Sequence, residues 1–149
     1  MIRIMPAQPH DLAALYELID HSELPRAGLA EHLNSALIAR KGDQLVGSVA
    51  VECYGDAGLL RSVAVDSAYR GQGVGAELIA AAFDLARRQG ITTIYLLTTS
   101  APDYFPRFGF HTIARTEVAD AVRQSVEFTE ACPASAIVMR AAVVTDRSE

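Results

Sequence analysis

Residues 69–78 read YRGQGVGAEL, with glycine at positions 71, 73 and 75 and an arginine at position 70. Glycine is costly to order, so three glycines on alternate positions require a structural reason. LLRSVAV at 59–65 has the apolar character of a strand, and an amphipathic helical pattern follows from residue 75 to residue 89. Because a strand, a glycine-rich turn and a helix present free backbone N–H groups to an anion, we predict a phosphate-binding turn here.

A dinucleotide-binding fingerprint is the alternative interpretation of the same glycines. Gly71, Gly73 and Ala76 fit the pattern G-x-G-x-x-[GA]. That fold also needs a strand that leads directly into the glycines and an acidic residue about 20 positions later for the ribose. Here DSAYR separates the strand from the glycines, and ITTIYLL at 91–97 carries no acidic residue. The context therefore argues against a nicotinamide-dependent redox domain.

Composition sets broad limits on the protein. The length of 149 residues predicts a single domain over residues 1–149. A net charge of −5 argues against a nucleic-acid-binding surface and favours a small-molecule or protein partner. Cys53 and Cys132 lack metal-ligand spacing, so we expect reduced thiols and no metal. With no run of about 18 apolar residues and no signal-peptide pattern, we expect a cytoplasmic protein without membrane partners.

The hydrophobic pattern along the chain predicts a mixed α/β sheet flanked by helices. The expected strands are 2–5, 36–40, 45–54, 59–65, 93–97, 110–113 and 136–144, and the expected helices are 9–19, 28–33, 75–89, 101–108 and 120–127. Ser100 and Asp103 have the spacing of a capping box for the helix at 101–108. We expect the apolar tail strand to be able to complete a homodimer interface.

The loop RGQGVG at 70–75 resembles the R/Q-x-x-G-x-G/A acetyl-CoA loop of the GNAT N-acetyltransferases. VAV at 63–65 and FGF at 108–110 stand where that family has its fourth strand and the end of its fourth helix. The resemblance covers almost the whole chain and is most specific over residues 59–110. The segments GDAGLLRSVAV, IYLLTTSAPDYFPRFGF and FTEACPASAIVM are also similar to GNAT enzymes encoded in arsenic-resistance operons and to amino-acid N-acetyltransferases of the arginine-pathway type.

This resemblance implies the GNAT fold, in which the fourth and fifth strands splay apart and the pantetheine arm of acetyl-CoA fills the gap. It implies that the fourth strand pairs with that arm and that Val63 N–H stabilises the thioester oxygen as it becomes an oxyanion. It also implies that backbone amides of the glycine loop bind the pyrophosphate. The residues expected to bind acetyl-CoA are Val63, Ala64, Val65, Arg70, Gly71, Gln72, Gly73, Val74, Gly75, Ala76 and Phe105.

The family often uses a tyrosine, four residues before the glycine of the GF pair, to protonate the thiolate leaving group. Counting back from Gly109 gives Phe105, and Tyr104 lies one position earlier. One position turns a side chain by about 100° around a helix. Tyr104 is therefore a candidate acid, with a packing or surface tyrosine as the alternative. In the alternative case, solvent protonates the thiolate.

Glu52 is the best-placed candidate base for the acceptor amine. A four-residue GDAG loop would pair Tyr54 with Leu59 and place Glu52 opposite Arg61. One interpretation is a cross-strand ion pair, which lowers the glutamate pKa and makes it a poorer base. In the other, Arg61 binds an acceptor carboxylate while Glu52 takes the amine proton, directly or through water. The two can alternate, before and after substrate arrives.

The remaining substrate-side candidates are weaker, because surface and capping roles account for the same residues. They are Ser62, Arg26, His32 and Ser125. Cys132 is either a buried structural thiol or a reactive thiol near the acceptor.

Together these features predict an acetyl-CoA-dependent N-acetyltransferase for a small amine, in particular an amino acid or an analogue that carries a carboxylate. The alternative is a catalytically silent module that binds or senses acetyl-CoA.

Overall fold

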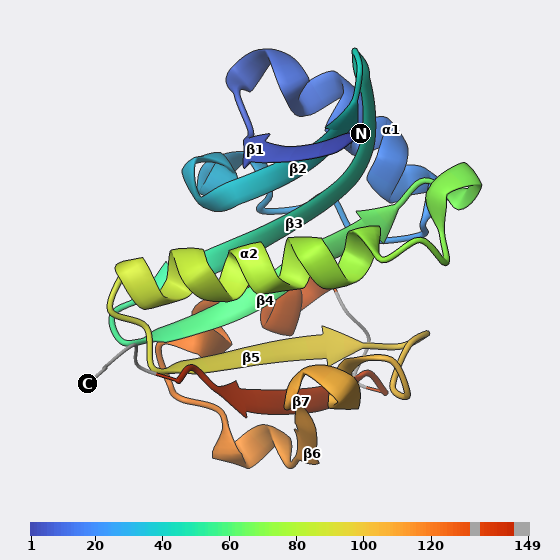
Figure 1. Cartoon of the computed structure of the whole chain (residues 1–149). Coiled ribbons are helices and arrows are strands. Elements are labelled where there is room, and N and C mark those ends of the chain that lie inside the picture. Colours follow the sequence, from blue (N-terminus) through green and yellow to red (C-terminus); the bar gives the residue numbers. More distant parts are fainter. Residues whose placement is uncertain (132–134, 145–149) are drawn as a thin grey trace.

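The computed structural model describes residues 1–131 and 135–144 (Figure 1). The strands are β1 (Ile2–Pro6), β2 (Ala36–Lys41), β3 (Gln44–Tyr54), β4 (Ala57–Val65), β5 (Thr93–Thr98), β6 (His111–Ile113) and β7 (Ile137–Ala142). The α-helices are α1 (Leu12–His21) and α2 (Val74–Arg88). Short helical turns are η1 (Pro9–Asp11), η2 (Ala30–Ser35), η3 (Ser67–Tyr69), η4 (Phe105–Phe108), η5 (Arg115–Glu117), η6 (Val122–Gln124) and the π-helical η7 (Glu127–Ala131).

The strands of the described chain form one sheet in the order β1-β2-β3-β4-β5-β7-β6. Every neighbouring pair is antiparallel except β4 and β5, which are parallel. The predicted mixed α/β sheet flanked by helices is therefore confirmed. The tail strand β7 lies between β5 and β6 rather than at an edge, so its apolar character is explained by burial inside this sheet.

Helices cover both faces of the sheet because strand side chains alternate between faces. α2 lies across β3 and β4 in Figure 1 and buries Leu78, Ile79 and Ala82 against one face. α1 packs Leu15 and Ile19 against the opposite face, on β2 and β3. The segment 114–128 extends the cover on that second face, over β4, β5 and β7. Each helix is held by an apolar stripe at helical spacing, which is the pattern that predicted it.

β4 and β5 separate soon after they meet. Their pairing is limited to Ala57–Leu59 on β4 and Thr93–Tyr95 on β5. Beyond Leu59 the two strands diverge, so residues 60–65 of β4 are not paired with β5 along this edge. The splay expected from the family resemblance is present.

A β-bulge in β4 lies directly after the separation begins. Ser48 pairs with Ala64 but Ala50 pairs with Arg61, so Ser62 and Val63 together oppose the single residue between Ser48 and Ala50. Ser62 has a φ of 58°, a left-handed conformation that is uncommon for a residue with a side chain. The buried Ser48 hydroxyl donates a 2.7 Å hydrogen bond to the Ser62 carbonyl and satisfies an acceptor at the bulge.

The register of the β3–β4 hairpin differs from the predicted one. Tyr54 pairs with Ala57, and Glu52 pairs with Leu59 rather than with Arg61. The reason is that only Gly55 and Asp56 form the turn, with Gly55 at a φ of 68°. A two-residue hairpin turn uses such left-handed positions. The error is two residues, so every side chain keeps its predicted face.

Two predicted helices are wrong. Only Phe105–Phe108 of the range 101–108 is helical, as a 3₁₀ turn, since Pro106 lacks the N–H that an α-helix needs. The helical turn begins at Phe105 with Tyr104 before it, so Ser100 does not stand at a helix start and the predicted capping box is also wrong.

The predicted helix over 120–127 is instead split into a 3₁₀ turn and a π-helical turn. Ser125 adopts an extended ψ of 143° between these turns and interrupts the helix. Its hydroxyl accepts a hydrogen bond from the Glu127 amide, which offers the backbone an alternative to helical bonding.

We expect Ser48→Ala to lower the free energy of unfolding by about 1–3 kcal/mol, because the buried Ser62 carbonyl loses this donor. Urea unfolding followed by circular dichroism measures the change. Ser67→Ala, at an exposed position, serves as the control and is expected within about 0.5 kcal/mol of wild type. A Ser48→Ala variant as stable as that control would contradict this account of the bulge.

Candidate active site

A cleft of about 630 Å³ lies between the free edge of β4 and the beginning of α2. Its lining includes Val63, Ala64 and Val65 of β4 and Ser22 and Leu24, which follow α1. The remaining lining residues are Tyr69, Arg70, Gly71, Gly73, Val74, Gly75, Ala76, Ser100, Ala101, Tyr104, Phe105 and Arg107. Residues that lie far apart in the sequence therefore meet at the opening that the strand separation creates.

The beginning of α2 supplies hydrogen-bond donors to this cleft. Gly73 caps the helix with a φ of 85°, and the helical bonding begins with Glu77 N–H donating to the Gly73 carbonyl. The amides of residues 73–76 therefore have no partner within the helix, and the positive end of the helix dipole points the same way. Arg70 lies at the mouth, where its Nε donates to the Val65 carbonyl at 2.9 Å. This end of the cleft has the donors and charge to bind a phosphate group.

The Tyr104 hydroxyl lies close to the start of the same helix. A Cβ atom at Gly75 would lie 2.5 Å from Tyr104 Oη, so glycine is needed there for the two to meet. The ring packs edge-on against Phe105 and Phe108, with the Arg107 guanidinium 4.8 Å from its centroid. Burial raises the pKa of Tyr104, against a smaller opposing effect of Arg107. The hydroxyl therefore keeps its proton at neutral pH.

A smaller cavity of about 160 Å³ adjoins the cleft. The two spaces share Leu24, Val63, Ser100, Ala101 and Phe105 in their linings. The smaller cavity adds polar groups that the cleft lacks: Glu23, Arg61, Ser62, Thr98, Thr99 and Glu127. Its position beside Val63, where β4 and β5 diverge, suits a second reactant that meets the first in the gap.

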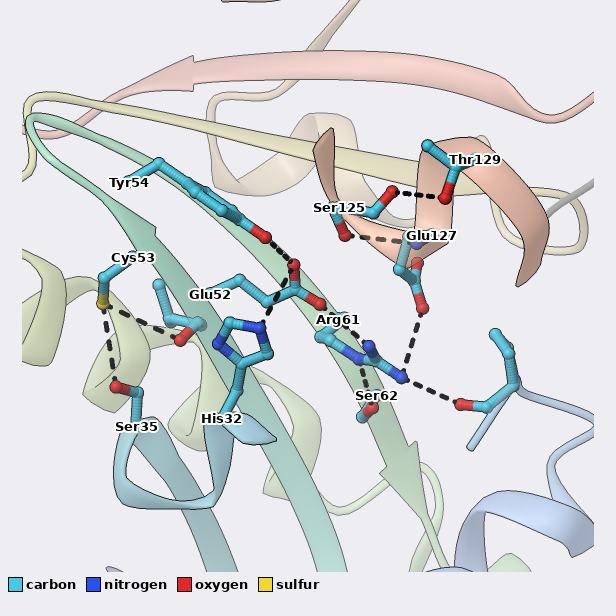
Figure 2. Close-up of polar contacts among 12 residues, drawn as sticks. His32, Ser35, Glu52, Cys53, Tyr54, Arg61, Ser62, Ser125, Glu127 and Thr129 are labelled. Atoms are coloured by element: carbon cyan, nitrogen blue, oxygen red, sulfur yellow. Dashed lines mark hydrogen bonds and ion pairs between the residues drawn. The ribbon is translucent and has the colours of Figure 1, made fainter. Parts of the chain in front are cut away.

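Arg61 is the centre of a buried polar cluster behind this cavity (Figure 2). Its Nη1 donates to Glu52 Oε2 at 2.8 Å, and its Nε donates to the Ser62 hydroxyl at 3.2 Å. Its Nη2 donates to the Pro25 carbonyl at 3.1 Å and lies 3.4 Å from Glu127 Oε2. The side chain is completely buried, so these partners replace its hydration.

Glu52 is fixed within this cluster and has no exposed surface. Tyr54 Oη donates to Glu52 Oε1 at 2.5 Å, and His32 Nε2 lies 3.7 Å from the same oxygen. Burial alone would raise the pKa of Glu52, but hydrogen bonds from Ser125, Tyr54 and Arg61 and the nearby His32 together lower it. Glu52 is absent from the linings of the cleft and the smaller cavity. Of the two interpretations of the Glu52–Arg61 pair, this geometry fits the ion pair.

Sequence reasoning missed two members of the cluster. Tyr54 shares a sheet face with Glu52 because the two are two residues apart on β3. This spacing could have predicted their proximity from the sequence. Its pKa is raised to about 12 by burial and by the neighbouring Glu52 carboxylate, so it acts as a donor. Glu127 is the last residue of the predicted helix 120–127, which the structure interrupts at Ser125, and no local pattern indicates that its carboxylate reaches Arg61.

The other site residues predicted from the sequence differ in where they lie relative to the cleft and the smaller cavity. Arg26 is exposed, pairs with Asp20 at 2.5 Å and stacks on Tyr16, and it is absent from the linings of the cleft and of the smaller cavity. The cleft lining contains ten of the eleven predicted acetyl-CoA-binding residues. The exception is Gln72, whose side chain is exposed. Ser62 lines the smaller cavity, whereas Ser125 and His32 contact Glu52. Cys132 lies outside the described residues.

Within the residues that the structure describes, no group of three or more His, Cys, Asp or Glu side chains is arranged to hold a metal ion. The helices of this same part of the chain are too short or too polar to cross a membrane.

We expect Glu52→Gln to lower the free energy of unfolding at pH 7 by about 3 kcal/mol, because it breaks a buried ion pair. A carboxyl whose pKa is lowered in the folded state stabilises the protein above its ordinary pKa of 4.5, and this contribution is lost as the pH falls through the lowered value. The stability difference between wild type and Glu52→Gln should therefore shrink below pH 4.5, as measured by urea unfolding between pH 7 and pH 3.

Asp84→Asn removes an exposed ion pair with Arg87 and serves as the control. Its effect should stay within about 0.5 kcal/mol of wild type. A Glu52→Gln difference that does not change with pH would show that the carboxylate charge is not the stabilising feature.

Solved structures with a similar fold include several acetyltransferases. N-acetylglutamate synthase from Neisseria gonorrhoeae, complexed with coenzyme A and N-acetyl-glutamate, has a TM-score of 0.84 at 23% identity, covering 97% of this chain and 35% of that one. Rv2747 from Mycobacterium tuberculosis, in complex with CoA, has a TM-score of 0.80 at 23% identity, covering 95% and 99%. The ribosomal-protein-S18-alanine N-acetyltransferase from Escherichia coli has a TM-score of 0.71 at 18% identity, covering 100% and 97%.

At these identities the likeness shows the fold. The chain spans about a third of the length of the Neisseria synthase. No curated protein matches the sequence.

The sequence family described as "Acetyltransferase (GNAT) domain" matches residues 32–112, which is more than half of the chain. The match includes the bulged strand β4, the glycine loop and α2, and it ends within β6. The chain therefore belongs to the GNAT acetyltransferase family.

Proposed function

We propose that this protein transfers an acetyl group from acetyl-CoA to the amine of a small molecule, in particular an amino acid or an amino-acid-like compound. The observation that carries the proposal is the cleft in which the free edge of β4 and the unpaired amides of α2 line one space. This cleft adjoins a small cavity whose lining includes Arg61, Ser62 and Thr98, and we assign this cavity to the acceptor.

The residues of the cleft fit acetyl-CoA. The amides of residues 73–76 and the positive end of α2 suit its pyrophosphate, with Arg70 at the mouth. The free edge of β4 from Val63 to Val65 suits the amides of the pantetheine arm. Coenzyme A in the Neisseria and Mycobacterium structures supports this assignment. When bound, acetyl-CoA supplies an activated acetyl thioester.

The catalytic roles follow from the positions of two groups. Val63 N–H stabilises the developing negative charge on the acetyl oxygen, from the strand edge that both spaces share. Tyr104 donates its proton to the departing thiolate, a role that its position in the cleft beside Gly75 supports. Glu52 acts as a structural partner of Arg61, and the amine proton passes to water.

Arg61 and Ser62 line the acceptor cavity and hold a carboxylate of the acceptor. Arginine binds carboxylates in a fork geometry, and an acceptor carboxylate that enters the cavity takes the place of one of the present partners of Arg61. The cavity volume of about 160 Å³ favours a small acceptor over a protein segment. The N-acetyl-glutamate found in the Neisseria synthase supports an amino acid as the first class to test. An arsenic-linked acceptor, a homodimer and a cytoplasmic location stay predictions from the sequence.

A catalytically silent acetyl-CoA-binding module is the second candidate. Phe105 occupies the position of the family's usual tyrosine, and it is buried against Phe110 at a centroid distance of 5.9 Å. A phenylalanine there cannot donate a proton. This candidate predicts stabilisation by acetyl-CoA without turnover.

We expect the protein to release free thiol from acetyl-CoA in the presence of at least one member of a panel of the twenty standard amino acids. Thiol release is followed by a colorimetric reagent, and mass spectrometry identifies the acetylated product. Thermal stabilisation by acetyl-CoA without turnover on any amine would favour the silent module. Absence of both stabilisation and turnover would overturn the acetyl-CoA assignment.

We expect Tyr104→Phe to lower kcat by about 100-fold without weakening acetyl-CoA binding, because it removes the proton donor and keeps the ring. Steady-state kinetics and a calorimetric titration with acetyl-CoA measure the two effects. Tyr69→Phe is the matched control, since Tyr69 also lines the cleft. An unchanged kcat in Tyr104→Phe would mean that solvent protonates the thiolate.

A further inference from the structure

We infer that the Ser22 hydroxyl binds the pantetheine arm of acetyl-CoA, at the amide of the arm that lies nearer the phosphates. This inference rests on the proposed use of acetyl-CoA and deepens it, because it assigns a side chain to the part of the cofactor between the thioester and the pyrophosphate. Ser22 follows α1 and lines the cleft together with residues 63–65 of β4. Its Oγ atom is buried and has no hydrogen-bond partner among the residues that the structure describes.

The missing partner distinguishes Ser22 from the buried serine and threonine residues elsewhere in the described chain. Each of those residues has a hydrogen-bond partner for its hydroxyl group within the protein, and they are Ser48, Ser62, Thr98 and Ser125. A buried polar group without a partner lowers the stability of the folded state. In a cleft that binds a ligand, this loss is recovered when the ligand supplies the partner.

The turn that carries Ser22 is fixed by backbone hydrogen bonds. Glu23 N–H donates to the Asp20 carbonyl at 3.0 Å, and Leu24 N–H donates to the Ile19 carbonyl at 2.9 Å. These two bonds form a Schellman motif, with Glu23 in the left-handed position at a φ of 58°. A serine at the end of a helix can bond to a carbonyl of the preceding turn, but here those carbonyls already accept backbone N–H groups. The backbone position of Ser22 is therefore set, and its hydroxyl is available to a ligand by rotation about the Cα–Cβ bond.

Ser22 lies toward the phosphate end of the cleft. A neighbouring space of about 530 Å³ shares Ser22, Val65 and Arg70 with the cleft lining, so these three residues lie where the two spaces meet. Val63, in contrast, lies where the cleft adjoins the smaller cavity assigned to the acceptor. The cofactor has the same order of groups, from the pyrophosphate through the two amides of the arm to the thioester. With the thioester at Val63, the amide nearer the phosphates lies at the level of Val65 and Ser22.

An amide in this position needs a partner that β4 does not supply. A trans amide directs its N–H and its C=O to opposite sides, so an amide that uses one of them on the free edge of β4 turns the other away from the strand. Ser22 belongs to the turn after α1 and not to β4, so it can meet the group that points away. A hydroxyl both donates and accepts, so it can serve either the N–H or the C=O.

The first test compares wild type with Ser22→Ala, with coenzyme A and ADP as the probes. We expect the Kd of coenzyme A, measured by calorimetric titration, to rise about 3- to 10-fold, because one hydrogen bond to the arm is lost. The affinity for ADP, which carries the pyrophosphate without the arm, is measured by displacement of coenzyme A and should change less than about 2-fold. The urea midpoint of the ligand-free protein should stay unchanged or rise, because the substitution removes an unpaired buried hydroxyl.

The second test uses a pair of variants with the same side-chain shape. Ser22→Thr keeps the hydroxyl and Ser22→Val replaces it with a methyl group, so the ratio of their Kd values for coenzyme A measures the hydroxyl alone. We expect Ser22→Val to bind coenzyme A about 3- to 10-fold more weakly than Ser22→Thr. Ser67→Ala is the control, since Ser67 is exposed and lines the neighbouring space but not the cleft, and its Kd should match wild type.

The outcomes separate this inference from the proposed function. If wild type binds coenzyme A, and neither Ser22→Ala nor the valine and threonine pair shows a difference, the role of Ser22 is overturned and the proposed function stands. An equal loss of coenzyme A and ADP affinity, or a lower urea midpoint in Ser22→Ala, overturns the assignment of the hydroxyl to the arm. A wild type without affinity for coenzyme A overturns the proposed function and this inference with it.

Discussion

The separation of β4 from β5 is the constraint on which both spaces depend. Parallel pairing ends at Leu59, and the bulge at Ser62 and Val63 lies in the part of β4 beyond that point. An unpaired strand edge exposes N–H and C=O groups without hydrogen-bond partners, and in most proteins such an edge can pair with another chain and cause aggregation. Here that edge forms a wall of the cleft, opposite the first turn of α2, so an extended ligand with amide groups can complete the sheet. The internal bond from Ser48 stabilises the distortion without closing the gap.

Arg61 links the strand to the irregular parts of the chain. Taking a guanidinium and two carboxylates out of water costs several kcal/mol per ion, and only good geometry offsets this. The guanidinium contacts the loop at Pro25, the strand β3 at Glu52 and the turn η7 at Glu127. Of these three segments, the loop at Pro25 and the short turn η7 lie outside the sheet. The buried cluster therefore fixes walls of the acceptor cavity that secondary structure alone would leave variable.

The parts of the fold that the sequence predicted well are those with local signals. The long helix agrees within one residue because its apolar stripe and its glycine cap are both local. The Glu52–Arg61 contact was predicted from a wrong register, and it exists because a shift of two residues preserves the face of every side chain. Glu127 could not be found in this way, because its position depends on how η7 packs against a strand over 60 residues away.

The missing family tyrosine bears on whether this protein is an enzyme or a silent module. The group to be protonated is a thiolate, and a thiol with a pKa near about 8.5 is already a reasonable leaving group at neutral pH. Each pKa unit corresponds to about 1.4 kcal/mol, so leaving as a thiolate at pH 7 costs about 2 kcal/mol without any acid. That penalty is small beside the stabilisation available from an oriented strand amide and a bound amine. Phe105 in place of the tyrosine therefore removes an aid to the proposed reaction rather than a requirement, and the strand edge and the proposed acceptor cavity matter more for it.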